Sequence, residues 1–104
     1  MSKKIEFSYE GTDYVLEYTK RSIRTMEAKG FVASDVESKP MTVLPMLFAG
    51  AFLANHKGTS QETIDAIYEA LDDKESLIAR LSDMYAEQLE KLTAPGNVVW
   101  KANW

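Results

Sequence analysis

Residues 40–55, PMTVLPMLFAGAFLAN, decide how the rest of the chain folds. Apolar side chains recur at helical spacing on every side of this stretch, which predicts a helix without a face for water. One face holds Met41, Leu44, Phe48, Ala51 and Phe52, and the opposite face holds Val43, Met46, Leu47, Leu53 and Ala54. We therefore expect this helix at the centre of the fold, or with one side offered to another protein.

The same stretch is too short for a membrane span. Pro45 and Gly50 interrupt the apolar run, and it stops before His56 and Lys57. Crossing a bilayer takes roughly 20 apolar residues. Pro45 removes a backbone donor, so it should kink the helix or mark its true start. No membrane partner is predicted.

Composition limits the class of protein. A chain of 104 residues is one domain with a modest core. Sixteen acidic against twelve basic residues give a net charge of −4, and no Lys/Arg run could follow a phosphate backbone, so no nucleic-acid partner is predicted. The chain has no cysteine, and its N-terminus, MSKKIEFSYE, lacks the apolar core of a signal peptide. We expect a cytoplasmic protein.

Residues 3–19 predict a β-hairpin, because apolar and polar residues alternate with a period of two. Gly11 and Thr12 suit a two-residue type II′ turn. That turn would pair Tyr9 with Tyr14, Phe7 with Leu16 and Ile5 with Tyr18 on one face.

Helices are predicted for most of the remainder. Thr19 can cap a helix over residues 20–29 that Gly30 ends. Residues 31–39 should be a loop, with a short strand or a helical turn as the alternative. A capping box at residues 59–62 opens a helix with the apolar set Ile64, Ile67, Tyr68 and Leu71. A last helix follows residues 72–75 and runs to about residue 93.

The fold class is therefore α+β, an N-terminal antiparallel β-hairpin packed on a bundle of about four helices. Residues 1–97 should form a single domain. Residues 98–104, VVWKANW, alternate in character and are either an extended C-terminal tail or an edge strand, which would be the third strand of the sheet.

The sequence offers no candidate for catalysis, cofactor binding or metal binding. His56 is the one histidine, and its place at the end of the apolar helix favours interaction with the helix dipole. No nucleophile motif, metal-ligand spacing or glycine-rich loop accompanies it. Asp72 and Asp73 precede a helix, where capping is the usual role of aspartate. We expect a protein that is not an enzyme.

What remains is apolar surface. Methionines beside leucine and phenylalanine in the central helix suit an adaptable groove for a partner's helix, although core packing explains the same residues. The predicted partner-binding residues are Val43, Met46, Leu47, Leu53 and Ala54, with Trp100 and Trp104 as the second choice. An exposed apolar face would drive self-association, so a homo-oligomer is expected to cover it.

Three stretches and the ending of the chain, read together, carry a family resemblance. They are IEFSYEGTDYVLEYTKRSIRTMEAKGF, KPMTVLPMLFAGAFLANH, DKESLIARLSDMYAEQLEKL and GNVVWKANW. These stretches resemble the sequences of small proteins that are encoded among the tail genes of siphophages and prophages and are regarded as tail assembly chaperones. The resemblance covers nearly the whole chain, and no catalytic motif defines the family.

The resemblance implies a non-enzymatic protein in the cytoplasm of a bacterial host cell. It would bind the long, aggregation-prone tape measure protein and keep it soluble until the major tail tube protein, a second candidate partner, polymerises around it. In many such phages a ribosomal frameshift also yields a longer product with the same N-terminal domain. Two alternatives stay open: a structural tail or head–tail completion protein retained in the virion, and a small inhibitor of a host enzyme.

Overall fold

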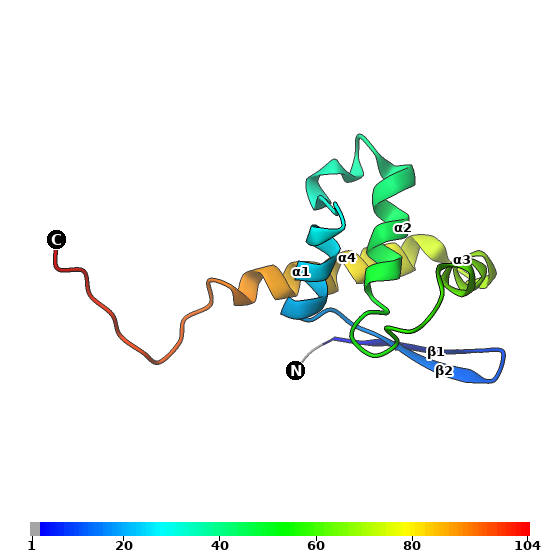
Figure 1. The fold of residues 1–104 in the computed structure, drawn as a ribbon, viewed down its shortest axis with the longest axis horizontal. Coiled ribbons are helices and arrows are strands. Elements are labelled where there is room, and N and C mark those ends of the chain that lie inside the picture. The colour runs from blue at the N-terminus through cyan, green and yellow to red at the C-terminus, as the bar shows by residue number, and fades with distance from the viewer. Residues whose placement is uncertain (1–2) are drawn as a thin grey trace.

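The computed structural model describes residues 3–104, and its first element is a β-hairpin of β1 (Ile5–Tyr9) and β2 (Thr12–Leu16) (Figure 1). The predicted register is wrong by two residues, because Tyr9 pairs with Thr12 and Ile5 with Leu16. The turn consists of Glu10 and Gly11, both with positive φ (48° and 80°), which is the type I′ pattern. A shift of two residues keeps each side chain on its predicted face.

The chain passes from the hairpin into α1 (Lys20–Ala28). Thr19 caps this helix as predicted, and its side chain and that of Ser22 each accept a backbone N–H in a capping box. Ile23 and Met26 are buried, and Gly30, with a φ of 98°, follows the C-cap. The short helix η1 (Ala33–Val36) then occupies the connection for which a helical turn was one alternative.

The central helix α2 (Pro40–Gly50) is shorter than predicted. After Gly50 the backbone tightens, since the N–H groups of Ala51 and Phe52 bond three residues back, to the carbonyls of Phe48 and Ala49. The helix does begin at Pro40, and Pro45 lies inside it. Residues 51–55 form a turn that carries Phe52 into the core.

The last two helices are α3 (Gln61–Ala70) and α4 (Lys74–Lys91). Ser60 rather than Thr59 caps α3, because its side chain accepts the N–H of Thr63. Asp73 caps α4 from a left-handed conformation. The apolar residues of these helices that are fully buried are Ile64, Ile67, Leu81, Met84 and Tyr85, whereas Leu89 and Leu92 at the end of α4 are exposed.

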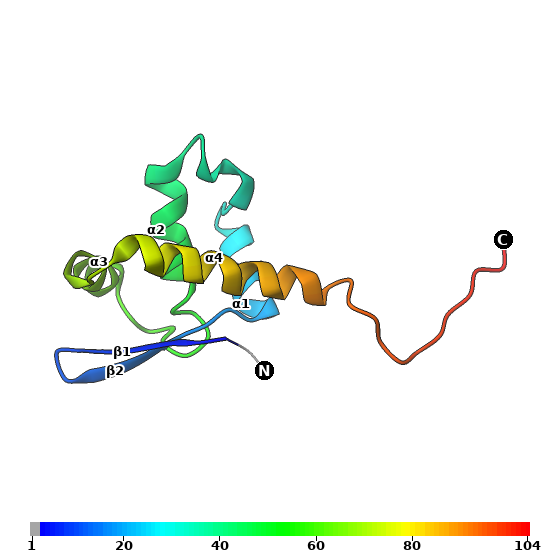
Figure 2. The ribbon, with the colours of Figure 1, turned by 180° about the vertical axis from the view of Figure 1, so that it is seen from behind.

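Helix α2 is central, as predicted, because it contacts η1, α1, α3 and α4. In Figure 1 it stands between α1 and α3, and Figure 2 shows from behind how α4 crosses the other helices. The most enclosed large side chains are Leu16, Tyr18, Phe48, Phe52, Ile67 and Leu81. The protein is therefore an α+β domain whose hairpin and helices share one core.

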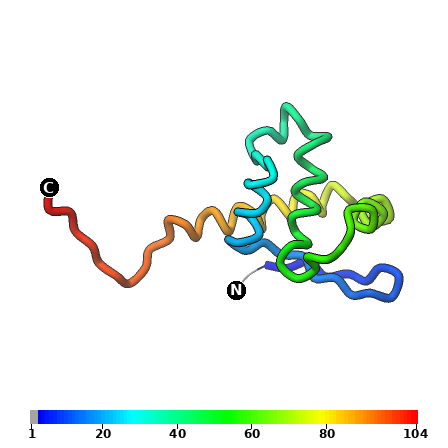
Figure 3. The backbone as a smooth tube through the Cα atoms, in the orientation of Figure 1, coloured from blue at the N-terminus to red at the C-terminus, as the bar shows by residue number. Residues whose placement is uncertain are grey.

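Residues 98–104 form neither helix nor strand, and the sheet within residues 3–104 has two strands. The tail continues away from the end of α4 (Figure 3), and the molecule measures 58 × 32 × 24 Å along its principal axes. The strand alternative for this segment is thus not realised within one chain. Within residues 3–104, no helix has both the length and the hydropathy of a membrane span.

Candidate functional site

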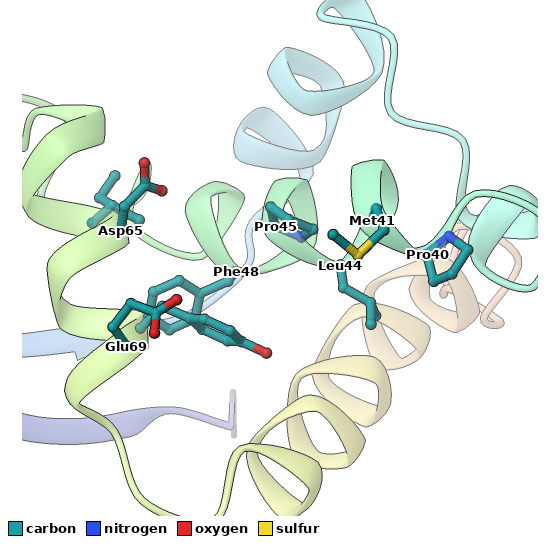
Figure 4. A pocket seen from close by; sticks show the side chains of 9 residues that line it. Pro40, Met41, Leu44, Pro45, Phe48, Asp65 and Glu69 are labelled. Carbon is teal, nitrogen blue, oxygen red and sulfur yellow. The ribbon is translucent and has the colours of Figure 1, made fainter.

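A groove of about 440 Å³ opens between α2 and α3 (Figure 4). Its lining comes from α2 (Pro40, Met41, Leu44, Pro45 and Phe48) and from α3 (Ile64, Asp65, Tyr68 and Glu69). Phe48 is 1% exposed and forms the floor with Ile64, whereas Met41 at the open end is 89% exposed. The groove therefore extends from the core of the domain to Met41, which residues 3–104 leave almost fully exposed.

Aromatic packing holds the floor in place. The rings of Phe48 and Tyr68 meet with centroids 5.0 Å apart, and Phe52 packs edge-on to Phe48 at 5.2 Å. Such edge-to-face pairs add to the area that the rings bury. The floor is thus rigid, while the thioether of Met41 is flexible and polarizable and can adapt to different neighbours.

Two prolines shape the α2 wall. Pro40 occupies the first turn, where its missing N–H costs nothing, but Pro45 lies inside the helix. Because proline has no N–H, the carbonyl of Met41 has no helical donor at the position four residues on. The wall therefore combines two apolar rings with a main-chain acceptor free of its helical bond.

The α3 rim of the groove is acidic. Asp65 and Glu69 line it from α3, facing the apolar residues of α2 (Figure 4). Gln61 donates a hydrogen bond to Asp65 across 2.8 Å. An apolar segment with Lys or Arg beside its apolar stripe would match this surface in both hydropathy and charge.

The family model described as "Domain of unknown function (DUF5055)" matches residues 1–104. The chain belongs to the DUF5055 family. Comparison with curated proteins and with solved structures gives no match.

The face predicted to bind a partner is partly interior, and for two residues the prediction needs correction. Val43 is 4% exposed and Leu47 is 5% exposed, and both belong to the core. The reason is that α1 and α4 pack on the side of α2 that carries these residues, opposite the groove. Their side chains cannot contact a partner in this conformation.

The other predicted residues remain accessible, but they do not form one surface. Met46 and Leu53 line a smaller cavity of about 210 Å³ between α1 and α2, with Lys29 at its rim. Leu53 and Ala54 border a second hollow next to α1. Trp100 and Trp104 are exposed in the tail. Partner binding by these five residues stays a prediction.

His56 has a different role from the predicted interaction with a helix dipole. The helix ends six residues earlier, and His56 Nε2 instead accepts the backbone N–H of Val15 across 2.9 Å. Its ring packs against Tyr14 with centroids 5.0 Å apart. Residues 3–104 contain no group of three or more His, Cys, Asp or Glu that could hold a metal ion.

The sequence analysis chose the opposite face of this helix as the partner-binding surface. Met41, Leu44 and Phe48 were grouped on one face, and among these three only Phe48 is fully enclosed. Pro40 and Pro45 were the signal that could have identified the groove, because they lie one helical turn or less from Met41 on the same side.

Proposed function

We propose that this DUF5055 chain is a non-enzymatic phage tail assembly chaperone that binds the tape measure protein in the groove between α2 and α3. It acts in the cytoplasm of a bacterial host cell, as a homo-oligomer, and releases its client when the major tail tube protein polymerises. The observation that carries the proposal is the partly open apolar groove, which the sequence resemblance to tail assembly chaperones places in a biological context.

The dimensions of the groove suit a helical client. From Met41 to Phe48 the α2 wall rises by about 10 Å, which is about two turns of helix. Tape measure proteins are long amphipathic helices, and two turns present apolar residues at positions i, i+3 or i+4, and i+7. A groove with packed aromatic rings as its floor and the flexible Met41 at its open end can accept varied side chains at those positions.

The charge at the rim of the groove also suits an amphipathic helical client. Asp65 and Glu69 border the groove, and the chain carries a net charge of −4. Basic residues beside the apolar stripe of a client helix would meet these carboxylates at the rim, where such pairs set register and specificity more than affinity. Clients with acidic flanks should bind less well.

The direct test is a charged substitution at the open end of the groove. Met41→Glu changes an exposed side chain, so the domain should stay folded, and we expect at least tenfold weaker binding to a purified tape measure fragment. Leu92→Glu is the matched control, because Leu92 is also exposed but lies at the far end of α4. Binding by both variants with the affinity of the unmodified protein would overturn the groove as the binding site.

A second measurement separates the chaperone from the structural alternative. Co-expression should keep the tape measure fragment in the soluble fraction, and Met41→Glu should reduce that fraction while Leu92→Glu does not. Purified virions should lack the protein. Its presence in stoichiometric amounts in virions would instead indicate a tail or head–tail completion protein.

A further inference from the structure

The two edges of the β-hairpin differ in how their backbone groups are bonded. On β2, His56 accepts the N–H of Val15 across 2.9 Å, and Asn55 Nδ2 donates to the carbonyl of Val15 across 3.2 Å. One residue beyond the strand, the N–H of Glu17 bonds to the carbonyl of Ala51. The turn after α2 therefore covers this edge and leaves no room for another strand.

The edge of β1 has no such cover. Glu6 pairs with Val15, and since the backbone groups of Val15 point away from the hairpin, those of Glu6 point outward on the other side. Ser8, two residues further, has the same orientation. Among residues 3–104, no backbone or side-chain group bonds to the outward N–H and C=O groups of Glu6 and Ser8.

The tail has the pattern of the missing strand. Val98, Trp100, Ala102 and Trp104 alternate with Val99, Lys101 and Asn103. Both tryptophans and both valines are exposed. The segment combines β-branched and aromatic residues, which favour strands, and no helix or strand within residues 3–104 covers it.

We propose that residues 98–104 of a second copy of this chain pair antiparallel with β1 as a third strand. The register that aligns charge places Lys101 beside Glu6, the one acidic residue within β1. The same register places Trp100 beside Phe7 and Val98 beside Tyr9, on the face where these β1 side chains are half-buried. Hydrogen bonding, hydropathy and charge thus agree on a single alignment.

The chain cannot supply this strand to itself. Lys3 contacts Glu87 across 3.7 Å, so α4 ends next to the beginning of β1. An antiparallel strand would have to start at the opposite end, beside Tyr9, about 20 Å away. Residues 92–97 span at most about 20 Å when fully extended, which leaves nothing for the reversal.

Donation of the tail from one copy to another allows two forms of assembly. Each copy has one tail to give and one β1 edge to fill, so two copies can exchange tails, or many can join head to tail. Either arrangement ends the exposure of the two tryptophans and of the open strand edge. The inference does not depend on the proposed function, because β1 and the tail lie outside the groove.

Cysteine cross-linking tests the pairing directly, because the natural chain has no cysteine. Glu6→Cys and Lys101→Cys would be made in separate proteins and mixed under mild oxidation. Partners in a hydrogen-bonded pair are about 5.5 Å apart at Cα, which a disulfide spans. We expect a heterodimer to form at least tenfold faster than in the control mixture of Glu62→Cys with Lys101→Cys. Equal rates in the two mixtures would overturn the proposal.

A proline pair provides the second test. Ser8→Pro removes an outward N–H on the open edge, and Asp13→Pro removes one on its cross-strand partner, so both spare the hairpin ladder. Light scattering should show that Ser8→Pro and deletion of residues 98–104 each weaken self-association at least tenfold, whereas Asp13→Pro does not. An unmodified protein that is monomeric at high concentration, or a Ser8→Pro variant that is folded and associates normally, would refute the model.

The groove variant keeps the two proposals distinguishable. Met41→Glu should leave both the cross-link and the self-association unchanged, since Met41 does not contact β1 or the tail. Loss of tape measure binding without loss of self-association would support the groove alone. Self-association that fails only in Met41→Glu would show that the groove, and not β1, joins the copies.

Discussion

The hydroxyl of Tyr18 donates a hydrogen bond to the main-chain carbonyl of Leu47 across 2.5 Å. Ala51 would normally supply the helical donor for this carbonyl, but its N–H bonds to Phe48 and Ala49 as the helix tightens at its end. Tyr18 is 2% exposed, so the bond is shielded from water. It connects the segment after β2 to the last turn of α2 at the centre of the core.

Tyr18→Phe should lower the free energy of unfolding by about 1–3 kcal/mol, because it leaves a buried carbonyl without a donor. Urea denaturation followed by circular dichroism would measure the loss. Tyr9→Phe is the matched control, since Tyr9 is half-buried at the end of β1. Equal stability of the two variants would show that the hydroxyl of Tyr18 contributes nothing.

Stability should also decrease at alkaline pH. Burial raises the pKa of Tyr18 well above its ordinary value of 10, and the neighbouring Tyr85 raises it further. The folded state therefore keeps a proton that the unfolded state loses above pH 10, and the free energy of unfolding should fall there by about 1.4 kcal/mol per pH unit. Below pH 10 this contribution is fully present.

Thermal unfolding between pH 9 and 11.5 would check the slope. The Tyr18→Phe variant should show a shallower decrease than the unmodified protein. Some decrease should persist in the variant, because burial, with a smaller effect of Glu27, also raises the pKa of Tyr85. Identical slopes for the two proteins would mean that Tyr18 does not carry the effect.

Gly50→Ala should be destabilising by about 1–3 kcal/mol, the usual cost of overpacking a core. A Cβ at this position would clash with Sδ of Met26, where α1 and α2 approach each other. Met26 is itself buried and would have to move. Shortening it in the double variant Gly50→Ala/Met26→Ala should cost less than the sum of the two single changes. If the losses of stability in the two single variants added up in the double variant, the contact with Met26 would not be the cause of the destabilisation.

His56→Ala should expose the covered edge of the hairpin. Val15 would lose the acceptor for its N–H, and we expect its amide hydrogen to exchange with solvent at least tenfold faster, as measured by nuclear magnetic resonance. Amides of the buried face of α4, such as that of Leu81, serve as the internal reference. A change of the same size at Leu81 would indicate global destabilisation and not a local effect.

The hairpin shows what sequence patterning can and cannot determine. The period of two was enough to predict that Phe7 and Tyr14 lie on the same inward face. In the structure their rings form a stacked pair with centroids 5.4 Å apart. The register could not be read in this way, because it depends on the turn. Glu10 adopts a positive φ that is unusual for glutamate, and this places the turn one residue earlier than Gly11 and Thr12 suggested.

The central helix shows the limit for the site. Its apolar pattern indicated correctly that it would lie at the centre of the fold, where Phe48 and Phe52 are enclosed. The pattern could not indicate how far each neighbour reaches. Helix α3 covers Phe48 but not Met41, so the face that was not chosen for a partner forms the candidate groove, while Val43 and Leu47, which were chosen, belong to the core. That distinction depends on tertiary packing, which periodicity does not encode.

The corner between α3 and α4 supports the α3 wall of the groove from outside the groove. Lys74 Nζ donates to the carbonyl of Leu71 across 2.8 Å and lies 5.7 Å from the centre of the Tyr68 ring. One lysine thus holds the end of α3 and steadies an aromatic side chain of the groove, while Asp73 fixes the start of α4. Since α3 is one wall of the groove and α2 the other, we expect a change at Lys74 or Asp73 to alter the width of the groove while leaving its lining residues unchanged.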